Sequence, residues 1–556
     1  MGEHVRFCCT TDDNDKDAIS PIRGWLHQKN KLTYTNASES MKVFNYHPSA
    51  LQLEENFTIM AKRKREAASG PQPDKKAPPK KAKAEAQVPK PSLYRADEPL
   101  TIQIVAGSYD RVLHGITATL APDSDSCQFS DTFLFNAHTS AIRCLALSPP
   151  SAPAPRQTQK VILATGGSDE RINLYNLSAH PPSAKSTDEQ KLLSSIAPRP
   201  ILENHNNREL GALLHHNSNI TRLDFPTRSK LLSASEDSTI AVTRTRDWSV
   251  LHTFKCPIPK MLGRPSGDTA AHDGAPSGVN DFAVHPSMKV MLSASKSERC
   301  MRLWNLVTGK KARALNFSRA ILTQVGEGRH STGEARKIVW GSDAGEDEFA
   351  VGFDRDIVVY SMDCKAKCRV MKEARTKLHE FRYVSLGEDD GSTILAVSTD
   401  DGRILFFSTK SEYLPSKKSN DDDEDEDEDE DKDALPSAKL IAQVGGKAAG
   451  VSGRVKDFAV LPVRTDDGKQ SWYVPAASSD GVIRVWQLTA EDLRLGEGEE
   501  DGKQVGKLRG SYETQNRITC MGAFVMIPRP DGAEESEFEF ESEEEGEDED
   551  ESEAEN

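Results

Sequence analysis

A short pattern recurs seven times between about residue 100 and residue 527, and it restricts what this chain can fold into. Each copy has an apolar run of five to six residues, a turn that carries an acid, an apolar residue three positions after the acid and a third key residue, mostly large, three positions further on. Because side chains three apart in a strand face opposite sides, these last two residues would pack against different neighbouring units. The pattern predicts an all-β domain made of seven similar units.

The acidic residue of each copy is expected to stabilise its turn. Its carboxylate can accept hydrogen bonds from turn amides and from a histidine in the preceding loop, for which His138, His215 with His216, and His272 are available. Successive acids lie 47 to 79 residues apart, more than the roughly 40 to 45 residues of a minimal four-stranded unit, so several loops must contain insertions. The seven predicted structural acids are Asp110, Asp169, Asp237, Glu298, Asp354, Asp401 and Asp480.

Several copies also carry a family resemblance. The segments that carry it are Thr165–Asp169 with Tyr175, Ser233–Asp237, and Ser478–Gly481 with Val485 and Trp486. These segments resemble WD repeats. The resemblance implies a seven-bladed WD-repeat β-propeller over residues 100–527. Its repeats are degenerate, with Thr243 and Ile116 in place of the usual tryptophan and Glu298 in place of the aspartate.

The two ends of this region predict how such a ring closes. The first unit starts directly with Ile102–Gly107 and lacks a preceding inner strand, whereas Arg517–Val525 is an extra strand at the end. We predict that the last strand completes the first blade. This pairing would close the ring and remove its open sheet edges.

Charge is distributed unevenly along the chain. The net charge of the whole chain is -16, yet Asp421–Asp433 carries -11 and residues 531–556 carry -16, which leaves +11 on the remainder. We predict an acidic disordered insert at 415–437 and an acidic disordered tail at 528–556. Residues 1–59 are predicted to be a disordered leader. Met60 begins like a natural start, so the working protein either includes or lacks this leader.

Residues 60–99 are predicted to form a basic disordered arm. Their bases form two groups separated by nine residues, the layout of a two-part nuclear import signal. We therefore expect the protein in the nucleus and nucleolus, although a solvated basic tail that attracts polyanions would have the same composition. The bases of the predicted import signal are Lys62, Arg63, Lys64, Arg65, Lys75, Lys76, Lys80, Lys81 and Lys83.

Several functional classes lack support in the sequence. Histidine, serine and aspartate occur together in several repeats, but the same residue types form the internal hydrogen-bond network of each WD blade. No nucleophile elbow, phosphate-binding Gly-Lys-Ser/Thr loop or zinc signature is present, and Cys364 with Cys368 lacks a second pair of ligands. No apolar run reaches the roughly 18 residues of a membrane span. We predict a non-enzymatic protein without metal, cofactor, small-molecule substrate or membrane contact.

One set of basic residues is placed to form a binding surface. They lie at the start of the predicted inner strands, where these strands would meet one rim of the ring and its channel. Bases gathered there would contact RNA phosphates or an acidic partner, unless they are ordinary solvated charges at strand ends. The candidate rim residues are Arg143, Arg222, Arg336, Lys337, Arg382, Arg454, Lys456 and Arg517.

Longer segments carry a second, narrower resemblance. They are Ala106–Gly115, Glu209–His216, Ile220–Leu223, His285–Ser287, Met301–Gly309 and Arg517–Cys520. These segments resemble one particular family of WD-repeat proteins. It comprises a fungal assembly factor of the large ribosomal subunit, of the maintenance-of-killer type, and its animal counterparts, the p21-activated-kinase-interacting proteins.

This second resemblance implies a function. The expected role is a non-enzymatic scaffold in large (60S) subunit assembly and rRNA maturation. Its partners would be pre-60S ribosomal particles, assembly factors and ribosomal proteins, with a weak rRNA contact, and the protein would be monomeric outside the particle. Two alternatives stay open: an adaptor that binds and negatively regulates a p21-activated kinase, and a histone-binding WD adaptor whose acidic segments contact the client.

Overall fold

The computed structural model divides the chain into two units, Met1–Lys81 and Ala82–Asn556. All of the first unit lies outside the described residues, and with it the predicted leader. The nine bases of the predicted import signal, His272, the acidic tract Asp421–Asp433 and the residues after 529 also lie outside them. The structure describes the strand Leu93–Tyr94 and residues 98–529 with gaps at 154–156, 182–200, 205, 259–276, 329–330, 344, 372–375, 388–392, 415–433, 466–467 and 495–501.

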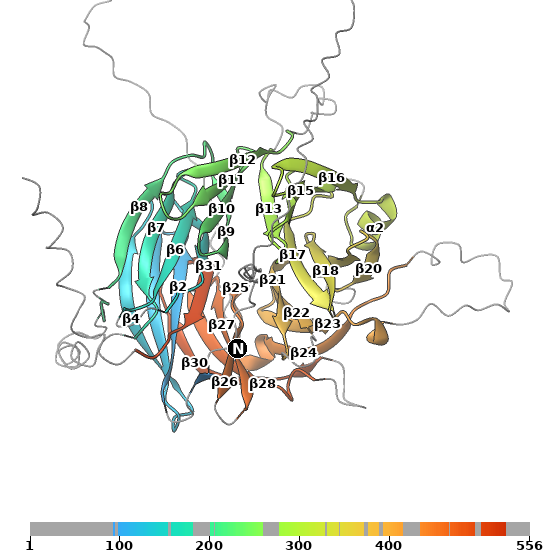
Figure 1. Ribbon diagram of the computed structural model, residues 1–556. Coiled ribbons are helices and arrows are strands. Elements are labelled where there is room, and N and C mark those ends of the chain that lie inside the picture. The colour runs from blue at the N-terminus through green and yellow to red at the C-terminus, as the bar shows by residue number, and fades with distance from the viewer. Residues whose placement is uncertain are drawn as a thin grey trace, which may run out of the picture. The chain divides into compact units, whose positions relative to one another are not determined.

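The second unit is a seven-bladed β-propeller, in which seven sheets surround a common axis (Figure 1). The blades are numbered here in chain order, and each is given from its inner to its outer strand. Blade 2 comprises β5 (Ile142–Leu147), β6 (Lys160–Gly167), β7 (Ile172–Ser178) and β8 (Arg208–Leu213). Blade 3 comprises β9 (Ile220–Thr227), β10 (Lys230–Ser235), β11 (Thr239–Arg244) and β12 (Val250–Lys255).

The next two blades repeat this four-stranded antiparallel order. Blade 4 comprises β13 (Val279–Val284), β14 (Val290–Ser295), β15 (Cys300–Asn305) and β16 (Lys310–Asn316). Blade 5 comprises β17 (Lys337–Asp343), β18 (Glu346–Gly352), β19 (Ile357–Ser361) and β20 (Ala366–Arg369). The short helix α2 (Arg319–Gln324) connects them, and the Ser318 hydroxyl caps it by accepting a hydrogen bond from the Ile321 amide at 3.2 Å.

Blades 6 and 7 depart from the simple order. Blade 6 comprises β21 (Leu378–Ser385), β22 (Thr393–Thr399), β23 (Arg403–Ser408) and β24 (Lys439–Gly445), with β29 (Lys503–Gln504) added outside. In blade 7 the inner strand is split into β25 (Val455–Phe458) and β26 (Leu461–Thr465), which both pair with β27 (Gln470–Ser478). Outside β27 lie β28 (Val482–Thr489) and β30 (Lys507–Glu513). Two 3₁₀ turns, η1 (Ser411–Tyr413) and η2 (Lys447–Ala449), lie in the connections.

Blade 1 confirms the predicted closure. Its inner strand is β31 (Ile518–Val525), the last strand that the structure describes, followed outward by β2 (Leu100–Ser108), β3 (Val112–Leu120) and β4 (Cys127–Asn136). β31 pairs antiparallel with β2, Ile102 opposite Val525 and Gly107 opposite Cys520. Figure 1 shows the red last strand beside the blue first blade. The ring therefore has no open edge at its seam.

An additional strand precedes the predicted start of the propeller at residue 100. β1 (Leu93–Tyr94) pairs in parallel with β26 of blade 7, with Leu93 opposite Arg464. The predicted basic arm of residues 60–99 thus ends in a strand that is joined to the ring. Of the predicted acidic insert at 415–437, the described part also contacts the ring, because Ser437 forms a bridge with Arg369 at the end of β20.

The repeated apolar and third positions form the contacts between blades. Ile357 packs into a cluster shared by blades 5 and 6, whereas Tyr360 on the same strand packs into a cluster shared by blades 4 and 5. This opposite facing is the predicted consequence of their spacing. Each apolar residue is at most 1 % exposed: Leu113, Ile172, Ile240, Met301, Ile357, Ile404 and Ile483. Within the described residues, no helix is long and apolar enough to cross a membrane.

Candidate binding face at the channel mouth

In blades 2 and 3 the turn acids accept hydrogen bonds from histidines. Asp169 contacts His138 Nδ1 at 3.0 Å, and the other ring nitrogen of His138 contacts the Thr165 hydroxyl at 2.9 Å. Asp237 contacts His216 Nδ1 at 3.1 Å, and His216 Nε2 lies 2.8 Å from the Ser233 hydroxyl. Asp169 also accepts from a backbone amide, that of Thr139. These hydrogen bonds hold each turn against its blade, and every side chain in the two sets has a hydrogen-bond partner within its own blade.

The other five turn acids bind bases or amides. Asp354 lies 3.1 Å from Arg336, and Asp401 lies 2.7 Å from Arg403. Glu298 forms a bidentate ion pair with Arg302. Asp480 accepts a hydrogen bond from the Val482 amide at 3.1 Å, and Asp110 accepts one from the Arg517 amide at 3.3 Å. All seven acids thus lie in turns before the third strand, but only those of blades 2 and 3 use a histidine among the described residues.

The inner strands meet at a cavity of about 350 Å³, here called the mouth. Residues from β5, β9, β13, β17, β21, β25 and β31 line it, so every blade contributes. Two of the eight predicted rim bases, Arg454 and Arg517, immediately precede inner strands without lining the cavity. The other six line it: Arg143, Arg222, Arg336, Lys337, Arg382 and Lys456.

Three buried carboxylates in the mouth escaped the sequence analysis. Asp281 lies 3.3 Å from Arg222, and Asp457 lies 3.1 Å from Arg382. Glu380 is paired with Lys337. The two aspartates also accept hydrogen bonds across blades, from the Ile338 and Met521 amides respectively, each at 2.9 Å. Each stands at the third residue of its inner strand. An acid at that position has no sequence signal of its own, because its basic partner lies on another blade.

The pKa values of these groups follow from burial and pairing. Burial raises the pKa of Asp281, although Arg222 and Lys337 oppose this effect. Burial also raises the pKa of Asp457, and the charge of Glu380 adds to the rise. For Glu380 itself burial would raise the pKa, but the surrounding bases, Lys337 foremost, lower it. The buried groups of the mouth therefore form a network of ion pairs that connects neighbouring blades. The bases in this network already have carboxylate partners.

The outer bases of the mouth are more accessible to a partner. The Arg143 side chain is 45 % exposed and lies 3.7 Å from Glu236, and Arg336 is 48 % exposed beside Asp354. Arg454 is 56 % exposed and lies 3.3 Å from Asp400. Exposed ion pairs of this kind are worth only about 0–1 kcal/mol, so an incoming anion can compete for these bases at little cost.

On the part of the rim formed by blades 6, 7 and 1, the side chains of Lys456 and Arg517 form no ion pair within the described residues. Lys456 Nζ lies 3.2 Å from His379 Nε2, whose ring also contacts Asp400 at 2.8 Å. Burial lowers the pKa of Lys456, and the positive charges of Arg454 and Arg517 contribute. Asp400 opposes this effect without cancelling it. An incoming anion can therefore bind Lys456 and Arg517 here without displacing a carboxylate.

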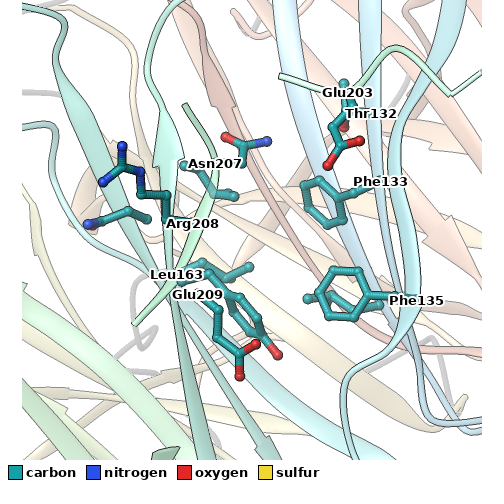
Figure 2. A pocket seen from close by; sticks show the side chains of 12 residues that line it. Thr132, Phe133, Phe135, Leu163, Glu203, Asn207, Arg208 and Glu209 are labelled. Atoms are coloured by element: carbon teal, nitrogen blue, oxygen red, sulfur yellow. The ribbon is translucent and has the colours of Figure 1, made fainter. Parts of the chain in front are cut away.

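A second hollow, of about 270 Å³, lies on the flank of the ring between blades 1 and 2 (Figure 2). We name it the flank groove. Its apolar side contains Phe133 and Phe135 of β4, with Tyr175 of β7 at 5.6 Å from the Phe135 ring. Figure 2 shows Arg208 on the side opposite these two phenylalanines. Phe135 is 40 % exposed, so this groove offers an apolar surface to a protein side chain.

The described residues show no group of three or more metal-binding side chains that could hold an ion. The histidine sets of blades 2 and 3 are also poor catalytic candidates. His138 and His216 are at most 6 % exposed, and both ring nitrogens of each have structural partners. What the mouth offers is charge and shape for binding.

Comparison with known proteins agrees with this architecture. The family model described as WD domain, G-beta repeat, matches residues 207–242, which begin just before β8, end within β11 and include the Asp237 turn. The match thus extends from the outer strand of blade 2 into the third strand of blade 3. The chain is a seven-bladed β-propeller that contains a WD repeat.

Three curated proteins illustrate what this propeller resembles. It is 23 % identical over 435 residues to a p21-activated protein kinase-interacting protein 1-like of Danio rerio, covering 78 % of this chain and 83 % of that protein. It is 25 % identical over 412 residues to Protein MAK11 of Saccharomyces cerevisiae, covering 70 % and 78 %. It is 23 % identical over 424 residues to Shk1 kinase-binding protein 15 of Schizosaccharomyces pombe, covering 76 % and 84 %. These matches agree with the family resemblance seen in the sequence.

Proposed function

We propose that this WD-repeat propeller is a non-enzymatic scaffold for assembly of large-ribosomal-subunit precursors and maturation of their rRNA, acting in the nucleolus. The observation that carries the proposal is the mouth, where every blade contributes and where accessible bases have only weak partners. Polyanions bind such a surface by releasing counterions. The family resemblance seen in the sequence implies the same role, and the likeness to Protein MAK11 of yeast agrees with that resemblance.

The residues outside the described part would complete this function. The nine bases between Lys62 and Lys83 would direct import into the nucleus. The acidic segments carry -27 between them and would repel rRNA, so they would keep the chain from binding RNA through its flanks. Pre-60S particles, assembly factors and ribosomal proteins are the proposed partners, and the propeller is monomeric outside the particle.

The test is an affinity purification of the full tagged chain from cells, with and without ribonuclease, followed by RNA sequencing and protein identification. The proposal expects precursor rRNA of the large subunit together with assembly factors, and ribonuclease should release part of them. A tagged chain with the bases from Lys62 to Lys83 replaced by alanine serves as the control for import, since it should stay outside the nucleus. Recovery of histones or a kinase without precursor rRNA would refute the proposal.

A second candidate function is binding of a p21-activated protein kinase. It is favoured by the names of the relatives in Danio rerio and Schizosaccharomyces pombe, both of which refer to kinase binding. The flank groove supplies an apolar contact surface of the kind that protein partners use. Phe135→Ser should then reduce kinase recovery in the same purification and leave rRNA recovery unchanged. Arg143→Gln is the matched control at the mouth.

A further inference from the structure

The bases around the mouth differ in whether they have an ion-pair partner. On the side of blades 2 to 4, Arg143 faces Glu236 and Arg222 faces Asp281. On the side of blades 6, 7 and 1, neither Lys456 nor the Arg517 side chain forms an ion pair among the residues that the structure describes. The same region contains Arg454, which has Asp400 as its partner. Two bases on one part of the rim are therefore left without an ion pair among the described residues.

An exposed aromatic residue accompanies this charge. Tyr109, in the turn between β2 and β3, is 59 % exposed, and the Arg517 guanidinium lies 5.5 Å from the centre of its ring. The Tyr109 amide donates a 2.8 Å hydrogen bond to the Arg517 carbonyl, which fixes the two residues relative to each other. A large aromatic ring this exposed gains little from packing in the folded chain. An aromatic ring with an adjacent guanidinium offers a platform on which a nucleobase can stack.

We propose that Tyr109, Arg517, Lys456 and Arg454 form a binding site for single-stranded RNA, an inference that rests on the proposed function and specifies its contact. One unpaired base stacks on Tyr109, and the basic side chains bind the phosphates on either side of it. A single strand fits better than a duplex, because a duplex keeps its base faces stacked inside, whereas an unpaired base exposes its face. Phosphates would also relieve the repulsion among the neighbouring bases.

Fluorescence anisotropy of the full chain with a labelled 12-nucleotide single-stranded RNA tests the site. Tyr109→Ala should weaken binding about 10-fold, since stacking is worth about 1–3 kcal/mol per base, and Tyr109→Phe should restore it. Lys456→Gln combined with Arg454→Gln should weaken binding and reduce the dependence on salt by about two units of the logarithmic slope. Tyr109→Ala should leave that slope unchanged, which separates stacking from charge.

Two controls make the result interpretable. Arg244→Gln removes a base of blade 3 that is 48 % exposed and does not line the mouth, and it should change the affinity less than twofold. Each variant is checked by circular dichroism and thermal melting, so loss of folding is not mistaken for loss of binding. Because the basic arm also attracts RNA, ultraviolet crosslinking with peptide mapping provides a second measurement, and Tyr109 or its neighbours should carry the crosslink.

The two proposals fail separately. Unchanged affinity in both Tyr109→Ala and the Lys456→Gln, Arg454→Gln double variant would overturn the binding site, and so would a crosslink confined to residues 60–99. If precursor rRNA is still purified in that case, the scaffold function stands and uses another surface. If the variants lose RNA binding but the purification recovers no precursor rRNA, the site stands and the ribosomal function fails.

Discussion

Blades 2 and 3 hold their turn acids in a different way from blades 5 and 6. In blades 2 and 3 the partner of the acid is a buried histidine, with side-chain exposures of 0 % for His138 and 1 % for His216. In blade 5 the partner of Asp354 is Arg336, whose side chain is 48 % exposed, and in blade 6 Asp401 pairs with a one-third-exposed Arg403. The same turn in the same fold is thus stabilised by two kinds of interaction.

The difference teaches that the position of the acid is required by the turn, whereas the partner depends on burial. A buried hydrogen bond to a charged group contributes roughly 1.5–3 kcal/mol, because water cannot replace the lost partner. A half-exposed ion pair contributes about 0–1 kcal/mol and is screened by salt. Substitutions at equivalent turns should therefore have unequal effects, and salt and pH should separate the two groups.

The largest effect is expected for Asp237→Ala in blade 3. Its carboxylate accepts hydrogen bonds from the Asn217 and Thr239 amides and contacts His216. Removing it leaves these groups without an acceptor, and we expect a loss of about 3 kcal/mol, measured as a shift in the urea unfolding midpoint of the full chain. Asp363→Asn, at an exposed turn, is the control and should shift the midpoint little. Equal shifts for both variants would contradict the comparison.

A smaller effect is expected on acidification and involves His215. Burial and the adjacent charge of His216 lower the pKa of His215 to about 4 from its ordinary value. Because the unfolded chain takes up this proton near pH 6.5 and the folded chain only near pH 4, stability is complete above about pH 6.5 and falls as the pH drops towards 4. Partial exposure limits the loss to about 1–2 kcal/mol.

Thermal melting between pH 7 and pH 4 measures this effect. His215→Gln can keep a hydrogen bond to Ser233 without titrating, so its melting temperature should fall less over this range than that of the parent chain. Below about pH 4 the lowered pKa of Asp237 becomes important. Stability from this carboxylate is complete above its unfolded pKa of about 3.9 and is lost as the pH falls through the folded value. Parallel melting curves for the parent and His215→Gln would show that His215 does not titrate as described.

The smallest effect is expected for Asp354→Asn in blade 5. Its carboxylate lies 3.1 Å from Arg336 and 3.3 Å from Lys377, which are 48 % and 47 % exposed. We expect less than about 1 kcal/mol at low salt, and roughly half of that or less in 0.5 M sodium chloride. Asp169→Asn in blade 2 should instead have a larger effect that salt leaves nearly unchanged. If salt suppresses both effects equally, burial does not distinguish the two groups of turns.

The sequence was informative where a residue type was repeated and uninformative where neighbours in space were distant in the chain. The seven blades and the closing strand could be predicted, because turn acids and apolar positions recur at a fixed offset and Arg517–Val525 had no other partner. Asp281 and Glu380 could not be predicted, because an acid inside an inner strand has no local signature. The role of each of these acids depends on a base of the adjacent blade, which lies some tens of residues away in the chain.

The same limit applies to the candidate site. Six of the eight predicted rim bases line the mouth, since the start of an inner strand fixes their height on the ring. Their accessibility was not predictable, because it depends on which bases the buried carboxylates engage. The prominence of Tyr109 was missed as well. Its position beside Arg517 results from the pairing of the first strands with the last one, which the sequence suggested without revealing the side chains that meet there.

Closure of blade 1 by β31 has a consequence for how the chain is made. β2 leaves the ribosome more than 400 residues before its partner β31, so the seam stays unpaired during nearly the whole of translation. During that time the edge of β2 and the apolar residues that later pack on Ile518 and Met521 are exposed, and such surfaces bind other nascent chains or chaperones. A ribosome that stops before Ile518 would release a chain with six complete blades and an open seam. The ring can close only after the eight residues of β31 have been synthesised.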